Sequence, residues 1–338
     1  MTLDAVLISY PPNISYLTGS PSRDSWLLLL KNTNLYITDS RYTEEAKQKL
    51  SREFRVLETR GSLIETTAQY CRQEKIRSLG FEEKYLSFAE YKKLRAILTK
   101  NTILHPAGGR IEKLRQIKSH KELKDIKKAA QIAMMALEFI RGWLKPGRKE
   151  IEVVAQLEYF MKNSGAQASA FDIIVASGAN SSFPHHISGN RKIKKNDLVL
   201  IDLGASYHGY KSDLTRVFFL GKMTGLQRKI LDIVRVAQQK ALKEIKPAVP
   251  ISRVDAAARQ YISQNGYGGF FAHALGHGVG LEVHEAPGIS GKAKEKMEAG
   301  MVFTVEPAIY LPGKFGIRIE DMVLVTGKGV EVISGSLN

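Results

Sequence analysis

Three acidic residues in the C-terminal two-thirds stand inside stretches that otherwise suit a buried strand, and they constrain the fold more than any other feature. Asp202 lies in LVLIDLG, Glu306 in MVFTVEP and Glu320 in GIRIEDMVLV. An isolated buried carboxylate is very unfavourable unless it is neutralised, paired or bound to a metal. The chain is therefore expected to fold so that these acids share a cationic partner.

Asp213 is a fourth acid that the chain can bring to the same place. It follows Asp202 by eleven residues, beyond a turn that contains Gly209. Adjacent antiparallel strands joined by such a turn would set the two carboxylates side by side.

Histidines gather in the same part of the chain. His277 stands in HALGHGVGLEVHE, with His273 before it and His284 after it. Imidazole is the commonest metal ligand among side chains and carries protons near neutral pH. His277 is therefore the candidate nitrogen ligand.

The four carboxylates and one neutral imidazole carry a formal charge of −4, which two divalent cations balance. Oxygen-rich ligation favours manganese, iron, cobalt or zinc over a metal selected by thiolates. Two ions about 3.5–4 Å apart would acidify a shared water and polarise a carbonyl oxygen. The sequence thus predicts a two-metal hydrolase with the ligands Asp202, Asp213, His277, Glu306 and Glu320.

Simpler interpretations exist for each residue taken alone. An acid at a strand end is more often a salt-bridge or turn partner, and a lone histidine is more often structural. Such interpretations have to hold for five residues at once. HALGHGVG also resembles a glycine-rich phosphate loop, but it lacks the strand and helix context and the P-loop lysine. We expect Gly276, Gly278 and Gly280 to let the backbone approach a crowded site instead.

Composition sets limits on partners and location. The single cysteine, Cys71, excludes an internal disulfide and a cysteine-based metal site. The N-terminus lacks the basic and apolar parts of a signal peptide, and no apolar run is long enough to span a membrane, so a cytoplasmic protein is expected. The formal charge of +16 favours a solvated basic surface, since no nucleic-acid-binding signature accompanies it.

The first part of the chain alternates strand and helix signals. Helices are expected after Asp39, Ser62 and Ser87, the last with a capping box to Glu90. Strands are expected at 5–9, 26–30, 35–38, 54–58 and 76–81. These signals predict a small α/β domain over residues 1–115, closed by a loop at 105–110.

The remaining residues, 116–338, are expected to form a second domain. Helices are predicted after Ser119, over 150–164, after Thr224 and after Ser252, the last with Asp255 as its capping partner. Strand-like runs stand between and after them: FDIIVA, DLVLIDLG, DLTRVFFLG, MVFTVEPAIYL and GIRIEDMVLV.

The chain resembles the pita-bread metallopeptidases, which include aminopeptidase P, Xaa-Pro dipeptidase (prolidase) and methionine aminopeptidase. The matching segments are VLIDLGASYHGYKSDLTRVF, HALGHGVGLEVHE, VFTVEPAIY and GIRIEDMV, and their order and spacing match too. DAVLISYPPNISYLTG is similar to the opening of the extra domain of the proline-specific members. The resemblance implies an α+β pita-bread catalytic domain behind an N-terminal α/β (creatinase-like) domain.

The resemblance also implies roles for the site residues. Asp202 would bind one metal, His277 and Glu306 the other, and Asp213 and Glu320 would bridge both. Catalytic roles fall to Glu306 as the base, to His185 near the substrate and to His284 beside the scissile carbonyl; His186 is a weaker candidate. Substrate-binding roles fall to His273, His284, Tyr310 and Arg318, the last through an ion pair with a ligand carboxylate.

Manganese is the first choice for the two divalent ions, with cobalt, zinc or iron as alternatives. The implied substrate is a peptide with proline at the second position. No membrane partner and no nucleic acid are expected, and a homodimer is left open. An Xaa-Pro bond has no N–H and a fixed φ, so peptidases that grip the backbone N–H cannot use it.

Two positions depart from the family pattern. Ala308 replaces the usual glycine after Glu-Pro. Alanine is tolerated there if the φ angle of this residue is negative. Gly288 stands where many prolidase-like relatives have an arginine that could clamp a dipeptide's C-terminal carboxylate. The leading expectation is therefore an Xaa-Pro aminopeptidase acting on longer peptides.

Four alternatives remain open. One is an Xaa-Pro dipeptidase. Methionine aminopeptidase activity is disfavoured by the large N-terminal domain, and a creatinase-type hydrolase by the full ligand set. The non-enzyme alternative is a binding module for nucleic acid or protein on the same fold. The basic charge favours this alternative, whereas the complete set of five candidate metal ligands argues against it.

Overall fold

The computed structural model describes residues 3–335. The chain divides into two compact units, residues 1–115 and residues 116–338. Among the described residues, no helix is long and apolar enough to cross a membrane.

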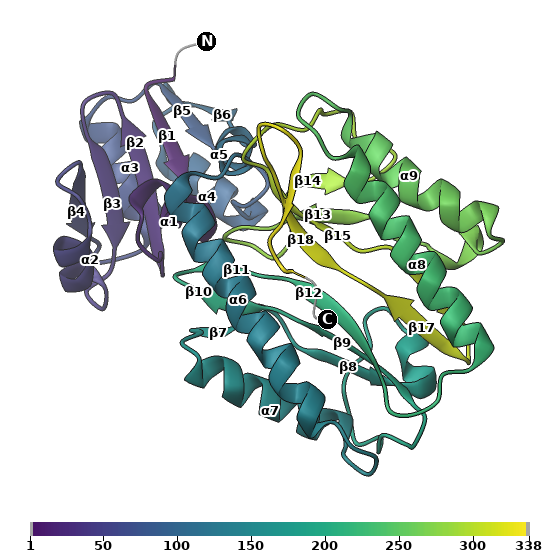
Figure 1. The fold of residues 1–338 in the computed structure, drawn as a ribbon. Coiled ribbons are helices and arrows are strands. Elements are labelled where there is room, and N and C mark those ends of the chain that lie inside the picture. Colours follow the sequence, from purple (N-terminus) through teal and green to yellow (C-terminus); the bar gives the residue numbers. More distant parts are fainter. Residues whose placement is uncertain (1–2, 336–338) are drawn as a thin grey trace. The chain divides into compact units, whose positions relative to one another are not determined.

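The N-terminal unit is built on one mixed six-stranded sheet (Figure 1). Its strands are, from edge to edge, β4 (Phe54–Glu58), β3 (Asn34–Thr38), β2 (Ser25–Leu30), β1 (Ala5–Ile8), β5 (Ser78–Phe81) and β6 (Ile103–Pro106). β2 runs antiparallel to both its neighbours, whereas β3–β4, β1–β5 and β5–β6 are parallel pairs.

Helices cover both faces of this sheet. Leu28 and Leu35 pack with α3 (Leu63–Gln73) and α4 (Phe88–Ile97) on one face. Leu27 and Tyr36 pack with α1 (Pro11–Thr18), α2 (Thr43–Lys49) and α5 (Arg110–Arg115) on the other. Successive residues of β2 point to opposite faces, so a strand that is buried on both faces is apolar throughout, as WLLLL is.

The expected strands are all present, and the structure adds the edge strand β6 and two helices, α1 and α5, that the sequence did not predict. α1 begins at Pro11 and Pro12, residues that suit the first turn of a helix because its first N–H groups need no partner within the helix. The loop expected at 105–110 is shorter than predicted. Its first two residues end β6, and Arg110 already begins α5.

A buried carboxylate connects the ends of two strands in the N-terminal sheet. Glu82, directly after β5, is 2% exposed. Its Oε2 accepts hydrogen bonds from the backbone N–H groups of Ser9 and Tyr10 at 2.7 and 2.8 Å, and its Oε1 accepts one from Asn13 at 2.6 Å. The acid thus ties the ends of β1 and β5 to the start of α1.

We expect Glu82→Gln to destabilise this unit by about 1–3 kcal/mol, the cost of leaving buried donors unpaired. Only one of the two terminal atoms of glutamine can accept, so either the Ser9 and Tyr10 N–H groups or the Asn13 amide would lose their acceptor. Urea unfolding would measure the loss. The exposed Glu53→Gln is the control, and equal stability of the two variants would contradict the role of Glu82.

The C-terminal unit contains two main antiparallel sheets. One has the order β12-β9-β8, from β12 (Leu214–Phe219), β9 (Leu198–Leu203) and β8 (Ile174–Ser177). The other has the order β14-β13-β15-β18-β19, from β14 (Glu285–Ile289), β13 (Gly276–Gly278), β15 (Val302–Val305), β18 (Asp321–Val325) and β19 (Val330–Val332). Smaller sheets join β7 (Ala168–Ser169), β10 (Ala205–Tyr207) and β11 (Tyr210–Lys211), and pair β16 (Ala308–Leu311) with β17 (Phe315–Arg318).

Two helix pairs cover these sheets (Figure 1). α6 (His120–Trp143) and α7 (Glu150–Asn163) share a core with β8, β9 and β12. α8 (Gly225–Glu244) and α9 (Ile251–Gln264) share a second core with β15 to β18. Short 3₁₀ turns occupy Gly178–Ser182 and Gly268–Phe270.

The capping box expected at Ser87 is present, and the helices expected after Ser119 and Thr224 also begin with capping boxes. The start expected at Ser252 is wrong. α9 begins at Ile251 behind Pro250, and Asp255 makes an ion pair with Arg259 at 2.7 Å rather than closing a cap. The i,i+4 arginine offers this buried carboxylate a charged partner that a cap would not.

The two longest strand-like runs are each broken in the middle. MVFTVEPAIYL divides into β15 and β16 around Glu306 and Pro307, and GIRIEDMVLV divides into β17 and β18 around Glu320. β15 pairs with β18 in one sheet, and β16 with β17 in another. Each segment therefore passes from one sheet to the other at its acidic residue. This places the carboxylates of Glu306 and Glu320 at the junction of the two sheets.

Candidate metal centre

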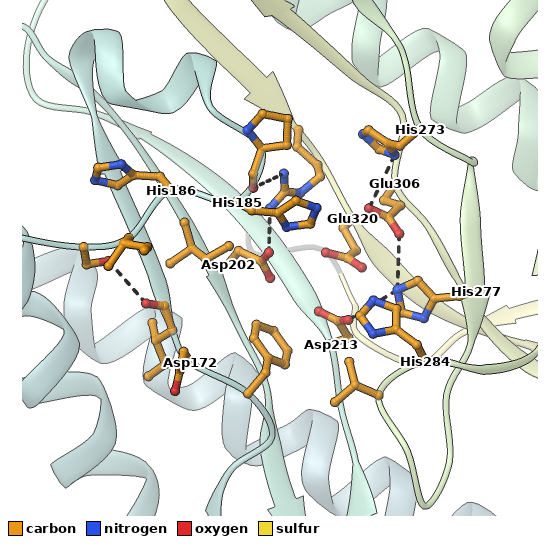
Figure 2. A pocket seen from close by; sticks show the side chains of 18 of the residues that line it. Asp172, His185, His186, Asp202, Asp213, His273, His277, His284, Glu306 and Glu320 are labelled. Carbon is orange, nitrogen blue, oxygen red and sulfur yellow. Dashed lines mark hydrogen bonds and ion pairs between the residues drawn. The ribbon is translucent and has the colours of Figure 1, made fainter. Parts of the chain in front are cut away.

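Five candidate ligands from five segments line one pocket (Figure 2). β9 and β12 pair antiparallel with Thr215 opposite Asp202, and Asp213 stands directly before β12. His277 comes from β13, and Glu306 and Glu320 come from the two strand breaks. The five residues are Asp202, Asp213, His277, Glu306 and Glu320.

The ligand atoms lie close enough to share cations. Single atoms of Asp202, Asp213 and Glu320 lie within 4.8 Å of one another, and so do atoms of His277, Glu306 and Glu320. His277 Nε2 is 3.5 Å from Asp213 Oδ2 and 3.3 Å from Glu306 Oε1. Glu320 belongs to both groups, so the two overlap.

The electrostatics of the pocket fit a cation. Burial and the neighbouring acids raise the pKa of Asp213 and Glu320 well above the usual range, and burial also raises that of Asp202. Burial opposes ionisation of Glu306 as well, but its hydrogen-bonded neighbour His277 lowers its pKa. The buried Oδ1 of Asp202 has no hydrogen-bond partner among the described residues. Mutual repulsion and an unpaired buried oxygen are both relieved by a divalent ion.

Arg318 is a buried cationic residue that contacts the acidic cluster. Its Nη2 donates to Asp202 Oδ2 at 2.5 Å, and its Nε donates to the hydroxyl of Thr215 at 2.9 Å. That hydroxyl donates to Glu320 Oε2 at 2.6 Å. Arg318 Nη1 also donates to the Tyr310 hydroxyl at 2.5 Å. One guanidinium therefore orients one candidate ligand directly and a second through a threonine.

Two further histidines stand beside the acids. The ring of His284 lies 4.1 Å from that of His277, and burial together with His277 lowers its pKa. His273 contacts the Tyr310 hydroxyl at 3.3 Å, and burial lowers its pKa as well. Both rings are therefore favoured in the neutral form near pH 7. The one N–H of neutral His273 is on Nδ1, which donates to the Ala274 carbonyl at 2.8 Å.

His185 and His186 diverge although they are adjacent. Figure 2 shows His185 beside Asp202 and Glu320, and His186 turned away from them. His186 Nε2 lies 2.9 Å from Glu150 Oε2. The side chain of His185 makes no hydrogen bond within the described part of the chain, and it is exposed in the pocket.

Two buried threonines that the sequence did not single out hydrogen-bond to the candidate ligands. Thr304 accepts from the His277 backbone N–H at 3.1 Å and donates to Glu306 Oε1 at 3.2 Å. Thr215 supports Glu320 in the same way. Each threonine stands within two residues of an acid in the sequence, but nothing in the strand pattern shows that its hydroxyl meets a carboxylate.

Glycines permit the close approach of backbones at this site. A Cβ on Gly276 would lie 1.9 Å from the carbonyl oxygen of Thr304, and one on Gly278 would lie 2.3 Å from that of Ala286. Real Cβ atoms do not approach backbone oxygens so closely. The glycines next to His277 are thus required by packing, which confirms the crowding expected around this residue.

A carboxylate-rich pocket with a histidine, at the junction of two antiparallel sheets, is typical of metal-dependent hydrolases. The chain belongs to metallopeptidase family M24, whose model matches residues 124–327. The model of the creatinase/prolidase N-terminal domain matches residues 1–117. The expected pita-bread metallopeptidase with a creatinase-like N-terminal domain is confirmed.

Relatives and solved structures cover nearly the whole chain. An Xaa-Pro dipeptidase from Pyrococcus horikoshii is 39% identical, over 97% of this chain and 92% of its own. The structure of an Xaa-Pro dipeptidase from Bacillus anthracis matches with a TM-score of 0.95 and 39% identity, over 99% of this chain and 93% of that one. An X-Pro aminopeptidase structure from Thermotoga maritima matches with a TM-score of 0.92 and 37% identity, over 99% and 96%.

Proposed function

We propose that this protein hydrolyses the Xaa-Pro peptide bond with two divalent metal ions, and that dipeptides are its main substrates. The observation that carries the proposal is the overlap of two ligand groups at Glu320 in the pocket. The curated relative named Xaa-Pro dipeptidase supports the choice of bond and of dipeptides. Cleavage of longer Xaa-Pro peptides, which the sequence placed first because of Gly288, becomes the second candidate, supported by the aminopeptidase structure.

Asp202, Asp213, His277, Glu306 and Glu320 would hold the ions, of which manganese is our first choice. Bound there, the ions would polarise the scissile carbonyl and lower the pKa of water. The oxygen-rich donor set and the unpaired Asp202 oxygen support this assignment.

Glu306 is the residue that we assign to proton transfer. Its lowered pKa keeps the carboxylate ionised near pH 7, so Oε1 can accept a proton from the attacking water. The Thr304 hydroxyl, 3.2 Å from that oxygen, and His277 restrict its orientation. The same carboxyl can return the proton to the proline nitrogen as the bond breaks.

His284 and His185 both line the pocket and would act on the substrate there. A neutral His284 can donate one N–H to the carbonyl oxygen as negative charge develops there. The His185 ring makes no hydrogen bond within residues 3–335 and lines the pocket, where it can contact the substrate. Tyr310, held by Arg318 and contacting His273, gives the pocket an aromatic wall for a proline ring.

The direct test compares Xaa-Pro dipeptides with Xaa-Pro-Yaa tripeptides after the purified chain is loaded with Mn²⁺. We expect release of the first residue from both, with a higher kcat/KM for dipeptides. A preference for tripeptides would favour the second candidate. Absence of cleavage of any Xaa-Pro peptide by protein shown to contain two ions would contradict both.

Gly288 offers a way to change this preference. It lines the pocket, is exposed, and a Cβ built on it meets no atom within 4 Å. We expect Gly288→Arg to raise kcat/KM for dipeptides about tenfold relative to tripeptides, because a charge-assisted hydrogen bond to the free carboxylate contributes about 1.5–3 kcal/mol. Gly288→Gln is the matched control with a long uncharged side chain, and equal effects of the two would contradict the carboxylate contact.

A further inference from the structure

The segment that carries His185 is tied to the first residue of α7. Glu150 is 0% exposed, and its Oε1 accepts hydrogen bonds from the backbone N–H and the hydroxyl of Ser177 at 2.8 and 2.7 Å. The same oxygen accepts from the Asn180 amide at 3.0 Å. Oε2 lies 2.9 Å from His186 Nε2 and 3.5 Å from the Gly189 N–H. One carboxylate therefore holds residues 177–189 at four points.

This carboxylate has no part in the chemistry assigned above, yet it is buried and fully hydrogen-bonded. An ionised carboxylate can only accept, so His186 Nε2 must carry the proton in their hydrogen bond. The first turn of a helix is also a favourable place for negative charge. Hydrogen bonds from Ser177, His186 and Asn180 lower the pKa of Glu150 against the effect of burial, which raises it.

We propose that Glu150, acting through His186, is a positioning residue that holds His185 in the catalytic pocket. The inference rests on the proposed function, in which His185 contacts the substrate. The His185 ring has no hydrogen bond of its own within residues 3–335, so the path of its backbone sets where it points. That path is held on one side by Pro184, whose carbonyl accepts from Arg318 at 3.5 Å, and on the other by His186.

The guanidinium of Arg318 and the carboxylate of Glu150 thus link the segment 177–189 to two different parts of the pocket. Arg318 contacts Asp202, so it ties the segment to the candidate ligands. Glu150 ties it to α7, whose Ile151 and Val154 line the pocket wall. Loss of the hydrogen bond between Glu150 and His186 would leave α7 folded. It would, however, allow the backbone next to His185 to move. The metal ligands lie on other strands and would keep their positions.

We expect Glu150→Gln to lower kcat/KM for Xaa-Pro dipeptides about 10–100-fold, the range seen when a partner that orients an active-site group is removed. Most of the change should be in kcat, and the affinity for Mn²⁺, measured by calorimetry, should not change. Glu152→Gln, on the same helix with its carboxylate on the backbone N–H of Lys149, is the matched control and should keep full activity.

A double-mutant cycle separates positioning from general stability. If Glu150 acts through His185, Glu150→Gln should cause no further loss in a His185→Ala background. His186→Gln, which keeps an N–H donor, should retain more activity than His186→Leu, which removes it. Additive losses of Glu150→Gln and His185→Ala would overturn the proposal, as would equal activities of the two His186 variants.

The position of His185 can also be measured without turnover. Its imidazole NMR resonance is identified by its absence from His185→Ala. We expect this resonance to shift in Glu150→Gln and not in Glu152→Gln. An unchanged resonance would overturn the positioning role even if the wild-type protein cleaved no Xaa-Pro peptide, whereas an inactive wild-type protein with a shifted resonance would contradict only the proposed function.

Discussion

Asp213→Asn is expected to lower kcat/KM for Xaa-Pro peptides by about 10³-fold or more. Asp213 shares one group of close ligand atoms with Asp202 and Glu320, and another with His277 and His284. An amide oxygen carries no charge, so the variant would hold two cations much more weakly. Polarisation of a carbonyl by a metal ion contributes several kcal/mol to the transition state, and each 1.36 kcal/mol is a factor of ten in rate.

Metal content gives a second measurement on the same variant. We expect fewer than two Mn²⁺ ions per chain in Asp213→Asn and two in the wild-type protein. Asp232→Asn, an exposed acid on α8, is the control and should change neither the metal content nor the rate. Full occupancy with full activity in Asp213→Asn would show that the ions lie elsewhere.

Metal-free protein is expected to lose stability as the pH rises above about 4, the ordinary pKa of an unfolded carboxyl. In the folded state, burial and neighbouring acids raise the pKa of Asp213 and Glu320. A group with a raised folded pKa contributes stability that is complete below the unfolded pKa and is lost as the pH rises through the folded pKa. The acids therefore destabilise the metal-free pocket at pH 8 relative to pH 5.

Two histidines contribute to stability with the opposite pH dependence, so the stability of the wild-type protein at two pH values has to be compared with that of a reference variant. Burial lowers the pKa of His273 and His284, which adds stability as the pH rises from 5 to 7. Asp213→Asn keeps both histidines and removes one acid. We expect the Tm of metal-free wild-type protein to fall, from pH 5 to pH 8, relative to that of Asp213→Asn. Parallel Tm curves would contradict the raised pKa of Asp213.

Adding metal should reverse this loss. Mn²⁺ at about 100 times its Kd would stabilise the wild-type protein by about 2.7 kcal/mol per site, which corresponds to a rise in Tm of several degrees for a unit of this size. Asp213→Asn should gain much less. Thermal unfolding at pH 8, with and without Mn²⁺, measures the difference.

Much of the local structure could be predicted because it depends on residues close together in the chain. The capping boxes at Ser87, Ser119 and Thr224 join a side chain to a backbone group three residues away. The antiparallel approach of Asp202 and Asp213 follows from two strands and a short connection with a turn at His208 and Gly209, both of which have positive φ. The start of α9 was misplaced because Ser252 and Asp255 fit a capping pattern, whereas the first N–H of the helix, that of Ile251, donates to the carbonyl of Glu295, which is distant in the sequence.

The sequence by itself determined which residues could hold metal, because a carboxylate within an apolar strand needs a charged partner wherever that strand lies. Only the tertiary structure decided that Glu306 and Glu320 stand at breaks between two sheets, since strand pairing joins residues far apart in the chain. It also decided that Thr215 meets Glu320, and that Glu150 holds the segment before and after His185. These contacts depend on distances in space, and no local periodicity of the chain records them.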